Sequence, residues 1–228
     1  MENNEFHCPL CDYRGELRTF RGRLYAQCPN CLSLERHRFQ FSALQQRFDE
    51  QTMQSMSALH FAPETCMRAY FSAHFGCYKT ADLMMNDVDY KIDIQSLPFS
   101  DESFDFIFAS HVLEHIPDDI KSLSEIYRIL KPNGIAILPV PIVCEHTVEY
   151  DEPDPLQDDH VRAPGLDYYD RYKMIFSSVE MVSSFDVAPN IQPFVYSKDE
   201  HVIRDDGWVH PYWVEGRKFI DTMPICYR

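Results

Sequence analysis

The chain has 228 residues, of which 45% are hydrophobic, so it is long enough for one ordinary α/β domain with a small appendage. This composition excludes a disordered or fibrous protein. No run of eighteen apolar residues occurs and the N-terminus is polar and acidic, so we expect neither a membrane span nor a signal peptide and predict a cytoplasmic protein. Only 7 residues are glycine, where an average chain of this length has roughly 16. They are too scattered for a GxGxxG or Walker-type phosphate loop.

Acidic residues dominate all but the N-terminal part of the chain. The formal net charge is -15; residues 1–48 have seven basic and five acidic side chains, whereas the remainder has 14 basic and 31 acidic. A surface of that sign repels a phosphate backbone, so a nucleic acid is not the partner that we expect for the larger part. The most acidic stretch, 145–170, has nine carboxylates and three prolines, which predicts a solvated loop.

Four of the eight cysteines form a metal-binding pattern near the N-terminus. Cys8 and Cys11 (CPLC) are separated by sixteen residues from Cys28 and Cys31 (CPNC). Disulfides are disfavoured inside cells, and two CxxC turns at this separation are typical of a tetrahedral zinc site. Four thiolates close the coordination shell, so we predict a structural rather than a catalytic zinc ion. The other four cysteines occur singly along the chain, and we interpret them as small, buried, apolar side chains.

The first predicted unit, residues 1–48, is a zinc ribbon followed by an amphipathic helix. The segment between the two cysteine pairs is rich in β-forming residues. Immediately after it, Leu34, Phe41, Leu44 and Phe48 recur at helical intervals. The polar stretch 49–57 predicts a linker into the second unit, residues 56–228.

Strands and helices alternate along the second unit. Apolar runs predict strands at 58–62, 77–82, 90–94, 104–110 and 135–141, with helices at 64–75 and 118–130. Beyond 145 the pattern weakens to a helix at 165–176, a strand at 178–185 and a last strand at 223–227 that can return as a hairpin. This alternation indicates an α/β fold with a doubly wound, Rossmann-like parallel sheet, whose ligand binds at the carboxyl ends of the strands.

Carboxylates lie near the ends of three successive predicted strands. Pro63 suits the first turn of the helix that follows it, and Glu64 complements the positive end of that helix. The Glu64 carboxylate would repel a pyrophosphate but attract an ammonium group, which favours S-adenosylmethionine over NAD or ATP. Asp82 lies near the spacing at which an acid binds ribose hydroxyls, and Asp93 suits an adenine amino group. Each acid alone is typical of a turn or a cap, but three at successive strand ends indicate a cofactor site.

The run from 93 to 141, DIQSLPFSDESFDFIFASHVLEHIPDDIKSLSEIYRILKPNGIAILPVP, resembles the corresponding segment of class I S-adenosylmethionine-dependent methyltransferases, in particular the methyltransferase type 11 group. More narrowly, CPLCDYRG, CPNCLSLERHR, LHFAPE, TADL and DDHVRAPGLDY are similar to a bacterial subgroup in which a zinc ribbon precedes such a domain. The resemblance covers roughly residues 6–175. It implies a methyltransferase that uses S-adenosylmethionine, with APE in place of the usual DxGxG-type turn.

The resemblance also implies a set of cofactor contacts. They are the turn under the methionine end (Ala62, Pro63 and Glu64), the ribose contact (Asp82 and Leu83), the adenine contact (Asp93 and Ile94), the pair beside the sulfonium (Ser110 and His111), and His60. His60 departs from the family pattern because most relatives have an acid there. Glu64 is the candidate to replace that acid.

Histidines are the candidates for the base, because imidazole accepts a proton near neutral pH. His160 in DDHVRAPG is the candidate on the substrate side. His111 and His115 in HVLEH are further candidates, although this segment recurs in relatives with unrelated substrates, which favours a positioning role. Arg162 either binds a substrate carboxylate or neutralises its acidic neighbours, and we favour the second interpretation.

Three functions remain open from the sequence. The first is an enzyme that methylates a small molecule or a peptide, with the ribbon as a structural or docking module. The second is RNA methylation, because four arginines of the ribbon interleave with Phe20 and Tyr25, although the negative charge of the larger part opposes it. The third is an inactive binding protein with the same fold, suggested by the missing glycines and by His60.

Overall fold

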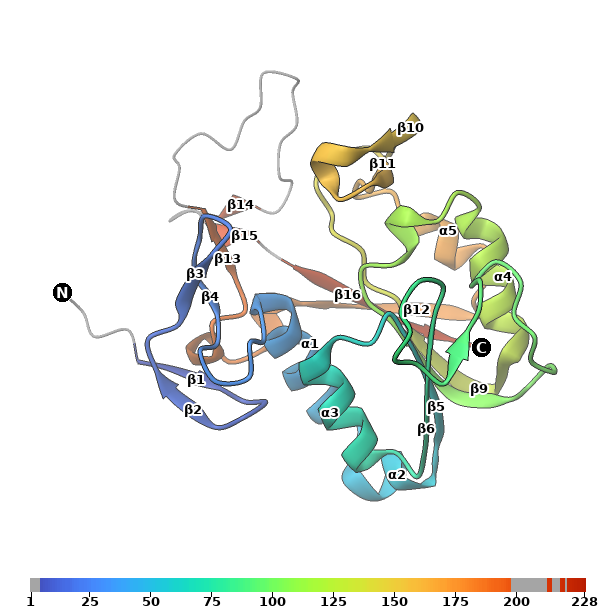
Figure 1. The fold of residues 1–228 in the computed structure, drawn as a ribbon, viewed down its shortest axis with the longest axis horizontal. Helices are drawn as coiled ribbons and strands as arrows, with labels where there is room; N and C mark the ends of the chain where they lie inside the picture. Colours follow the sequence, from blue (N-terminus) through green and yellow to red (C-terminus); the bar gives the residue numbers. More distant parts are fainter. Residues whose placement is uncertain (1–4, 198–212, 215–217, 220) are drawn as a thin grey trace.

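A seven-stranded central sheet covered by helices on both faces forms the body of the protein (Figure 1). The structure is a computed structural model that describes residues 5–197, 213–214, 218–219 and 221–228. In spatial order the strands are β12 (Ser178–Ser183), β16 (Thr222–Tyr227), β9 (Leu130–Ile137), β8 (Phe104–Ala109), β5 (Ser57–Phe61), β6 (Cys77–Asp82) and β7 (Tyr90–Lys91). The pairs from β9 to β7 are parallel, and β16 runs antiparallel to both of its neighbours. The predicted doubly wound, Rossmann-like sheet is confirmed.

The strand order reverses between β5 and β8. From β5 the chain continues outward to β6 and β7, and it then returns to the other side of β5 as β8 and β9. Ligands of doubly wound sheets bind at such a switch point, outside the carboxyl ends of the strands. The residues directly after the two strands, Ala62 and Ser110, therefore mark the expected binding region.

Alternate residues of β8 face two separate hydrophobic cores. Phe106 and Phe108 pack with α1 (Glu35–Gln45), α2 (Glu50–Ser55) and α3 (Thr65–His74). Ile107 and Ala109 pack on the opposite face with α4 (Asp119–Ile129) and with Tyr172 of α5 (Asp170–Lys173). A strand that is covered on both faces is apolar throughout, which is why FDFIFA stands out in the sequence.

The ribbon is built from two short hairpins. They are β1 (Phe6–Cys8) with β2 (Tyr13–Gly15) and β3 (Arg18–Phe20) with β4 (Arg23–Gln27). Arg21 and Gly22, which join β3 to β4, both have positive φ angles, 47° and 79°, as a two-residue type I′ turn requires. Strands β13 (Val195–Ser197), β15 (Lys218–Phe219) and β14 (Trp213–Val214) extend this hairpin into a five-stranded sheet. The two units predicted from the sequence thus share a sheet, and through α1 they also share a core.

Several predicted elements differ from those observed. The expected linker 49–57 contains α2, the expected strand 90–94 is reduced to β7, and the expected helix 165–176 is reduced to α5. The stretch 145–170, expected as a loop, contains the antiparallel hairpin of β10 (Val148–Asp154) and β11 (His160–Ala163). Short 3-10 helices complete the fold: η1 (Leu113–His115), η2 (Pro155–Gln157), η3 (Ser184–Asp186) and η4 (Pro189–Ile191). None of the helices in the described ranges has both the length and the apolar character needed to span a bilayer.

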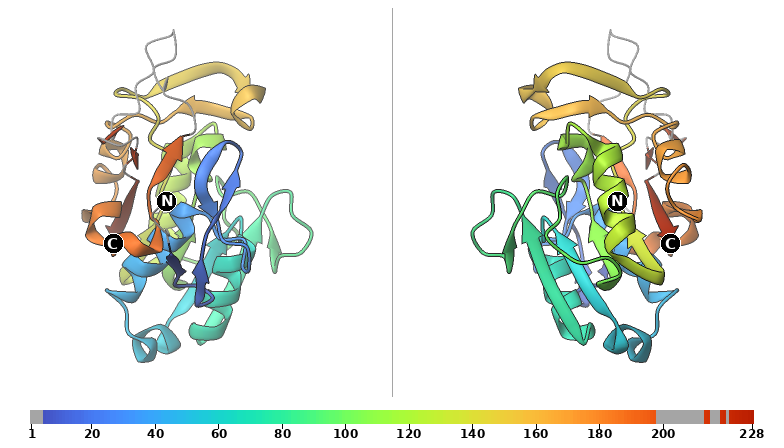
Figure 2. Two further views of the ribbon diagram at one scale, coloured as in Figure 1. Left: turned by 90° about the vertical axis from the view of Figure 1, so that its left-hand side faces the viewer. Right: turned by 90° about the vertical axis from the view of Figure 1, so that its right-hand side faces the viewer.

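The β10–β11 hairpin lies over one end of the central sheet, as both views of Figure 2 show. Arg162 anchors it there, and its side chain is almost completely buried. The guanidinium donates to the backbone carbonyls of Leu113, Ile116 and Pro117 at 2.6 to 2.9 Å and to the Glu149 carboxylate at 2.9 Å. Arg162 therefore neutralises an acidic neighbour and fixes the hairpin to the loop that follows β8.

Candidate functional site

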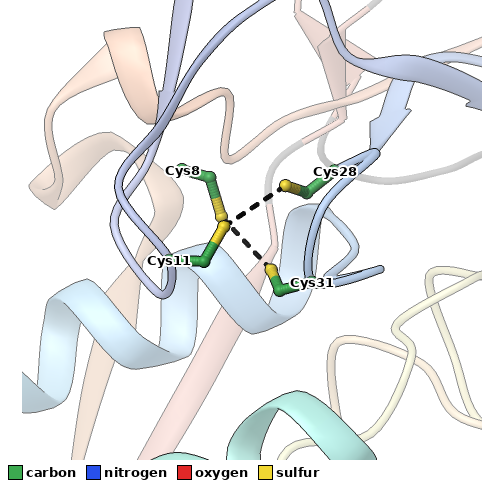
Figure 3. A group of neighbouring side chains, drawn as sticks. All are labelled: Cys8, Cys11, Cys28 and Cys31. Carbon is green, nitrogen blue, oxygen red and sulfur yellow. Dashed lines mark hydrogen bonds between the residues drawn. The ribbon is translucent and has the colours of Figure 1, made fainter.

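The four N-terminal cysteines converge on one point of the ribbon (Figure 3). The Sγ atoms of Cys8 and Cys31 are 3.5 Å apart, those of Cys11 and Cys28 are 3.6 Å apart, and all four lie within 4.8 Å of one another. These separations are far longer than a disulfide bond of about 2.05 Å. They are close to the edge of about 3.8 Å that a tetrahedron with Zn–S bonds of about 2.3 Å requires. The cysteine pairs therefore fit a closed, structural zinc site.

The turn after β5 adopts a backbone conformation that normally favours glycine. Ala62 has a φ angle of 47°, and its N–H donates to the Ala81 carbonyl at 3.0 Å. An alanine pays roughly 1–2 kcal/mol for this left-handed conformation, so the surrounding fold must hold it there. Pro63 and Glu64 follow at the start of α3. The chain thus keeps the shape of a glycine turn without the glycine.

Glu64 is held as an ionised carboxylate next to this turn. Its Oε2 lies 3.3 Å from His60 Nε2, and its Oε1 lies 3.5 Å from His37 Nε2. Burial opposes ionisation, but the interactions with His37 and His60 outweigh it and lower the pKa of Glu64. Oε1 has no hydrogen-bond partner of good geometry among the described residues. This buried oxygen fits the ammonium group of S-adenosylmethionine, as the sequence predicts for Glu64.

His60 lies behind Glu64 rather than at the surface. The His60 ring is 1% exposed, is packed edge-on between Phe71 and Phe108, and shares a hydrogen bond of 2.8 Å with the Tyr78 hydroxyl. The assignment of His60 as a direct cofactor contact therefore needs correction, because its side chain reaches a ligand only through Glu64.

The remaining predicted cofactor residues differ in accessibility. Pro63, Ile94 and Ser110 are buried, and the Ser110 hydroxyl binds the side chain of Gln40 in α1 at 3.1 Å. Leu83 is 52% exposed. Pro63, Leu83 and Ser110 follow β5, β6 and β8, and Ile94 follows β7.

Asp82 and Asp93 are half-buried, and each is oriented by the turn that follows it. Asp82 Oδ1 accepts from the N–H groups of Met84 and Met85 at 2.6 and 2.7 Å. Asp93 Oδ1 accepts from the Gln95 N–H at 2.8 Å. Such bonds fix the carboxylates before a ligand arrives, which suits the hydroxyl and amino groups of an adenosine.

A cavity of about 580 Å³ lies between the ribbon, the start of α1, the loop after β8 and the β10–β11 hairpin. Its charged and imidazole-bearing lining comprises Arg21, Arg23, Glu35, Arg36, His111, Glu114, His115, Asp158, His160 and Asp221. The two predicted catalytic histidines, His111 and His160, thus lie at one cavity although they are far apart in the sequence. Because His111 follows β8, the cavity opens beside the switch point of the sheet.

Unusual protonation equilibria characterise this cavity. Burial raises the pKa of Glu114 to about 8, and burial followed by the nearby charge of His115 lowers the pKa of His160 to about 4. Burial also lowers the pKa of His111 well below its usual range. His111 has a positive φ of 56°, a strained conformation of the kind found at functional sites. At neutral pH both imidazoles are therefore uncharged, with a free nitrogen lone pair.

Replacing Asp221 with asparagine should remove a pH-dependent loss of stability. Burial raises the pKa of Asp221 to about 6, with Arg36 acting in the opposite direction, whereas an unfolded aspartate titrates near about 3.9. Because the folded pKa is raised, this contribution to stability is complete below about pH 4 and is lost as the pH rises through about 6. In urea unfolding, the advantage of Asp221→Asn over wild type should grow by about 1 kcal/mol between about pH 5 and about pH 7.5. The same exchange at the exposed Asp151 is the control, and a pH-independent difference at Asp221 would contradict the assignment.

Several cavity residues did not emerge from the sequence as site candidates, among them Arg36, Glu114 and Asp221. Arg36 follows the zinc ribbon, Glu114 stands inside the HVLEH segment, and Asp221 precedes the last strand. Arg36 and Glu114 belong to stretches that resemble methyltransferases, CPNCLSLERHR and the run from 93 to 141, whereas Asp221 lies outside them. That these residues meet at one cavity depends on tertiary contacts that no local pattern reveals.

The strand order, with one antiparallel strand inserted beside a parallel doubly wound sheet, is that of a Rossmann-like methyltransferase fold. Residues 66–138 match a family model described as a methyltransferase domain. A demethylmenaquinone methyltransferase of Staphylococcus epidermidis is 40% identical over 45 residues, which are 20% of this chain and 19% of that protein. Cycloartenol-C-24-methyltransferase 1 of Oryza sativa subsp. japonica is 45% identical over 42 residues, 18% of this chain and 12% of that protein. These matches span about a fifth or less of the curated relatives.

Solved structures resemble the chain over much more of its length. An S-adenosylmethionine-dependent methyltransferase from Mesorhizobium loti superposes with a TM-score of 0.53 at 11% identity, covering 83% of this chain and 98% of that one. A candidate sarcosine dimethylglycine methyltransferase from Galdieria sulphuraria gives 0.52 at 19% identity, covering 84% and 85%. At such low identity the similarity establishes the fold alone.

Proposed function

We propose that the chain is an S-adenosylmethionine-dependent methyltransferase whose acceptor, a small molecule or a peptide, binds in the cavity beside β8. The observation that carries this proposal is the position of His111, which follows β8 at the switch point and also lines the cavity. The cofactor and the acceptor would therefore meet at one place. The methyltransferase-domain match and the shared fold support it. The ribbon of residues 1–48, with its structural zinc, would serve as one wall of the acceptor site.

The residues around the switch point suit the cofactor. When bound, S-adenosylmethionine supplies a methyl group on a sulfonium, open to in-line attack by a nucleophile. Glu64 Oε1 would hold the ammonium group, and Asp82 and Asp93 would bind the ribose and the adenine. The residues that line the cavity would orient the acceptor and exclude water from it.

Methyl transfer from the sulfonium to an O–H or N–H acceptor also requires a route for the proton that the acceptor loses. His111 Nε2 and His160 Nδ1 are buried, and neither has a hydrogen-bond partner within the described part of the chain. As uncharged imidazoles that line the cavity, they are the groups placed to accept that proton. The sequence predicts His160 as the base on the substrate side, whereas for His111 it favours a positioning role.

Titration calorimetry with S-adenosylmethionine and S-adenosylhomocysteine tests this function directly. We expect saturable binding of both, followed by transfer of a labelled methyl group to at least one member of an acceptor panel. Absence of heat with either compound at high micromolar concentration would contradict the enzyme and favour the inactive binding protein.

Glu64→Gln should weaken binding of S-adenosylmethionine by about 10- to 100-fold, since it removes a charge-assisted hydrogen bond to the ammonium group. Asp82→Asn should weaken it by about tenfold. Asp87→Asn is the matched control, because Asp87 lies in the loop that follows Asp82. Its side chain is 91% exposed and pairs with Arg68. Calorimetry measures the affinities and a melting curve checks that each variant is folded. Equal affinities for folded Glu64→Gln and Asp87→Asn would contradict the proposed ammonium contact.

The contacts of the ribbon arginines do not favour the alternative of RNA methylation. Arg23 pairs with Glu35 at 3.0 Å, and Arg21 pairs with Asp158 of the hairpin at 3.1 Å. Both therefore face acidic partners at the rim of the cavity. A salt-sensitive gel shift with RNA would reinstate this alternative.

A further inference from the structure

We propose that Glu114, His115 and His160 form a second metal site, open toward the cavity, for a divalent transition-metal ion such as Zn²⁺. Their ligand atoms lie within 4.8 Å of one another. Glu114 and His115 belong to η1 after β8, whereas His160 begins β11 of the hairpin. The site therefore joins two segments that Arg162 already fastens together.

Glu114 and His160 lack the hydrogen-bond partners that buried polar groups normally have. Glu114 is 0% exposed, and both of its carboxylate oxygens, like His160 Nδ1, have no hydrogen-bond partner among the described residues. Neither a lysine nor an arginine in those parts of the chain forms an ion pair with Glu114. A buried carboxylate in this state costs several kcal/mol unless it takes up a proton or a cation binds it. One metal ion would satisfy the carboxylate and the imidazole lone pair together.

The donor set indicates the class of ion. Two imidazoles with one carboxylate suit Zn²⁺ and neighbouring first-row ions, whereas Mg²⁺ and Ca²⁺ prefer oxygen ligands alone. The rings of His115 and His160 have centroids 4.7 Å apart and are nearly perpendicular, at 89°. Small shifts of the side chains would bring their nitrogens to coordination distance.

Three protein ligands leave at least one coordination position free, in contrast to the four thiolates of the ribbon. The free position would face the cavity, where an acceptor oxygen or nitrogen could bind the ion. This role rests on the proposed function, but the binding of the metal does not. With His160 engaged as a ligand, His111 would remain to accept the proton.

Metal content of the full-length chain tests the proposal. After equilibration with micromolar Zn²⁺ and gel filtration, we expect two ions per chain in the wild type. Glu114→Gln and His160→Gln should each retain the ribbon ion and bind the second at least about 100-fold more weakly. The matched controls are Glu145→Gln and His146→Gln, whose side chains are both 78% exposed in the same acidic segment and which should retain two ions.

A second measurement does not depend on any variant. Co²⁺ added to wild-type protein whose ribbon holds Zn²⁺ should give visible ligand-field bands without the intense thiolate charge-transfer absorption of a cysteine site. The proposal is overturned if the wild type holds one ion only, or if Glu114→Gln and His160→Gln retain the second ion as fully as the two controls do, which would mark nonspecific binding by surface acids. Because no cofactor is present, failure of S-adenosylmethionine binding leaves these outcomes unaffected.

Discussion

Replacing Arg38 with methionine is expected to lower the free energy of unfolding by about 4 kcal/mol. The Arg38 side chain is 0% exposed, and its guanidinium donates to five backbone carbonyls at 2.7 to 3.3 Å. These acceptors belong to Tyr25, Ala26, Ser33, Ile191 and Gln192. A buried carbonyl that loses its donor costs about 1–3 kcal/mol, and methionine offers no donor in return. Arg38 therefore joins the ribbon, α1 and η4.

Two further variants separate this role from the mere loss of a charge. Arg38→Lys keeps the charge but has at most three donors in place of five, so we expect an intermediate loss of about 2–3 kcal/mol. Arg68→Met removes a surface arginine that pairs with the exposed Asp87, and it should cost less than about 1 kcal/mol. Urea unfolding monitored by circular dichroism measures all three. Equal losses for Arg38→Met and Arg68→Met would contradict the importance of the carbonyl contacts.

The sequence predicts the central strands well because burial on both faces makes their apolar runs continuous. The strand predicted at 77–82 is observed with the same bounds, and the strand predicted at 104–110 ends one residue earlier. By contrast, β10 is not visible as a strand in the sequence. Its residues are mostly exposed, and Arg162 fastens the hairpin to a distant loop, a contact that no local periodicity records.

The candidate site could be predicted only where its residues follow strands. Glu64, Asp82 and His111 occur at strand ends, which a doubly wound topology brings to one edge of the sheet. Arg36 and Asp221 reach the cavity because α1 packs on the sheet and the last strand enters beside β9. Their positions depend on the tertiary fold, so sequence patterns give no indication of them. For His60 the sequence motif predicts a direct cofactor contact, but the burial of its side chain prevents that contact.

Loss of the zinc ion that we predict at the ribbon cysteines should impair the acceptor side of the cavity more than the cofactor side. Cys28→Ser removes a fully buried thiolate, so we expect loss of this ion and a fall in melting temperature of about 10 °C, equivalent to about 3–5 kcal/mol. The β3–β4 hairpin, which contributes Phe20, Arg21 and Arg23 to the cavity wall, would then lose its support. The cofactor residues after β5 and β6 are held by the central sheet instead.

These effects can be measured separately on the same protein. Calorimetry should show that Cys28→Ser weakens S-adenosylmethionine binding by no more than about tenfold, because α1 still contacts the switch point through the bond from Gln40 to Ser110. Methyl transfer to an acceptor should fall by more than about 100-fold, since a misplaced acceptor loses the near-attack geometry. Cys77→Ser, at an exposed cysteine on β6, is the matched control and should change neither the metal content nor the melting temperature. A Cys28→Ser protein that kept its zinc would contradict the assignment of Cys28 as a ligand. An equal loss of S-adenosylmethionine binding and of methyl transfer would contradict a role of the ribbon at the acceptor site alone.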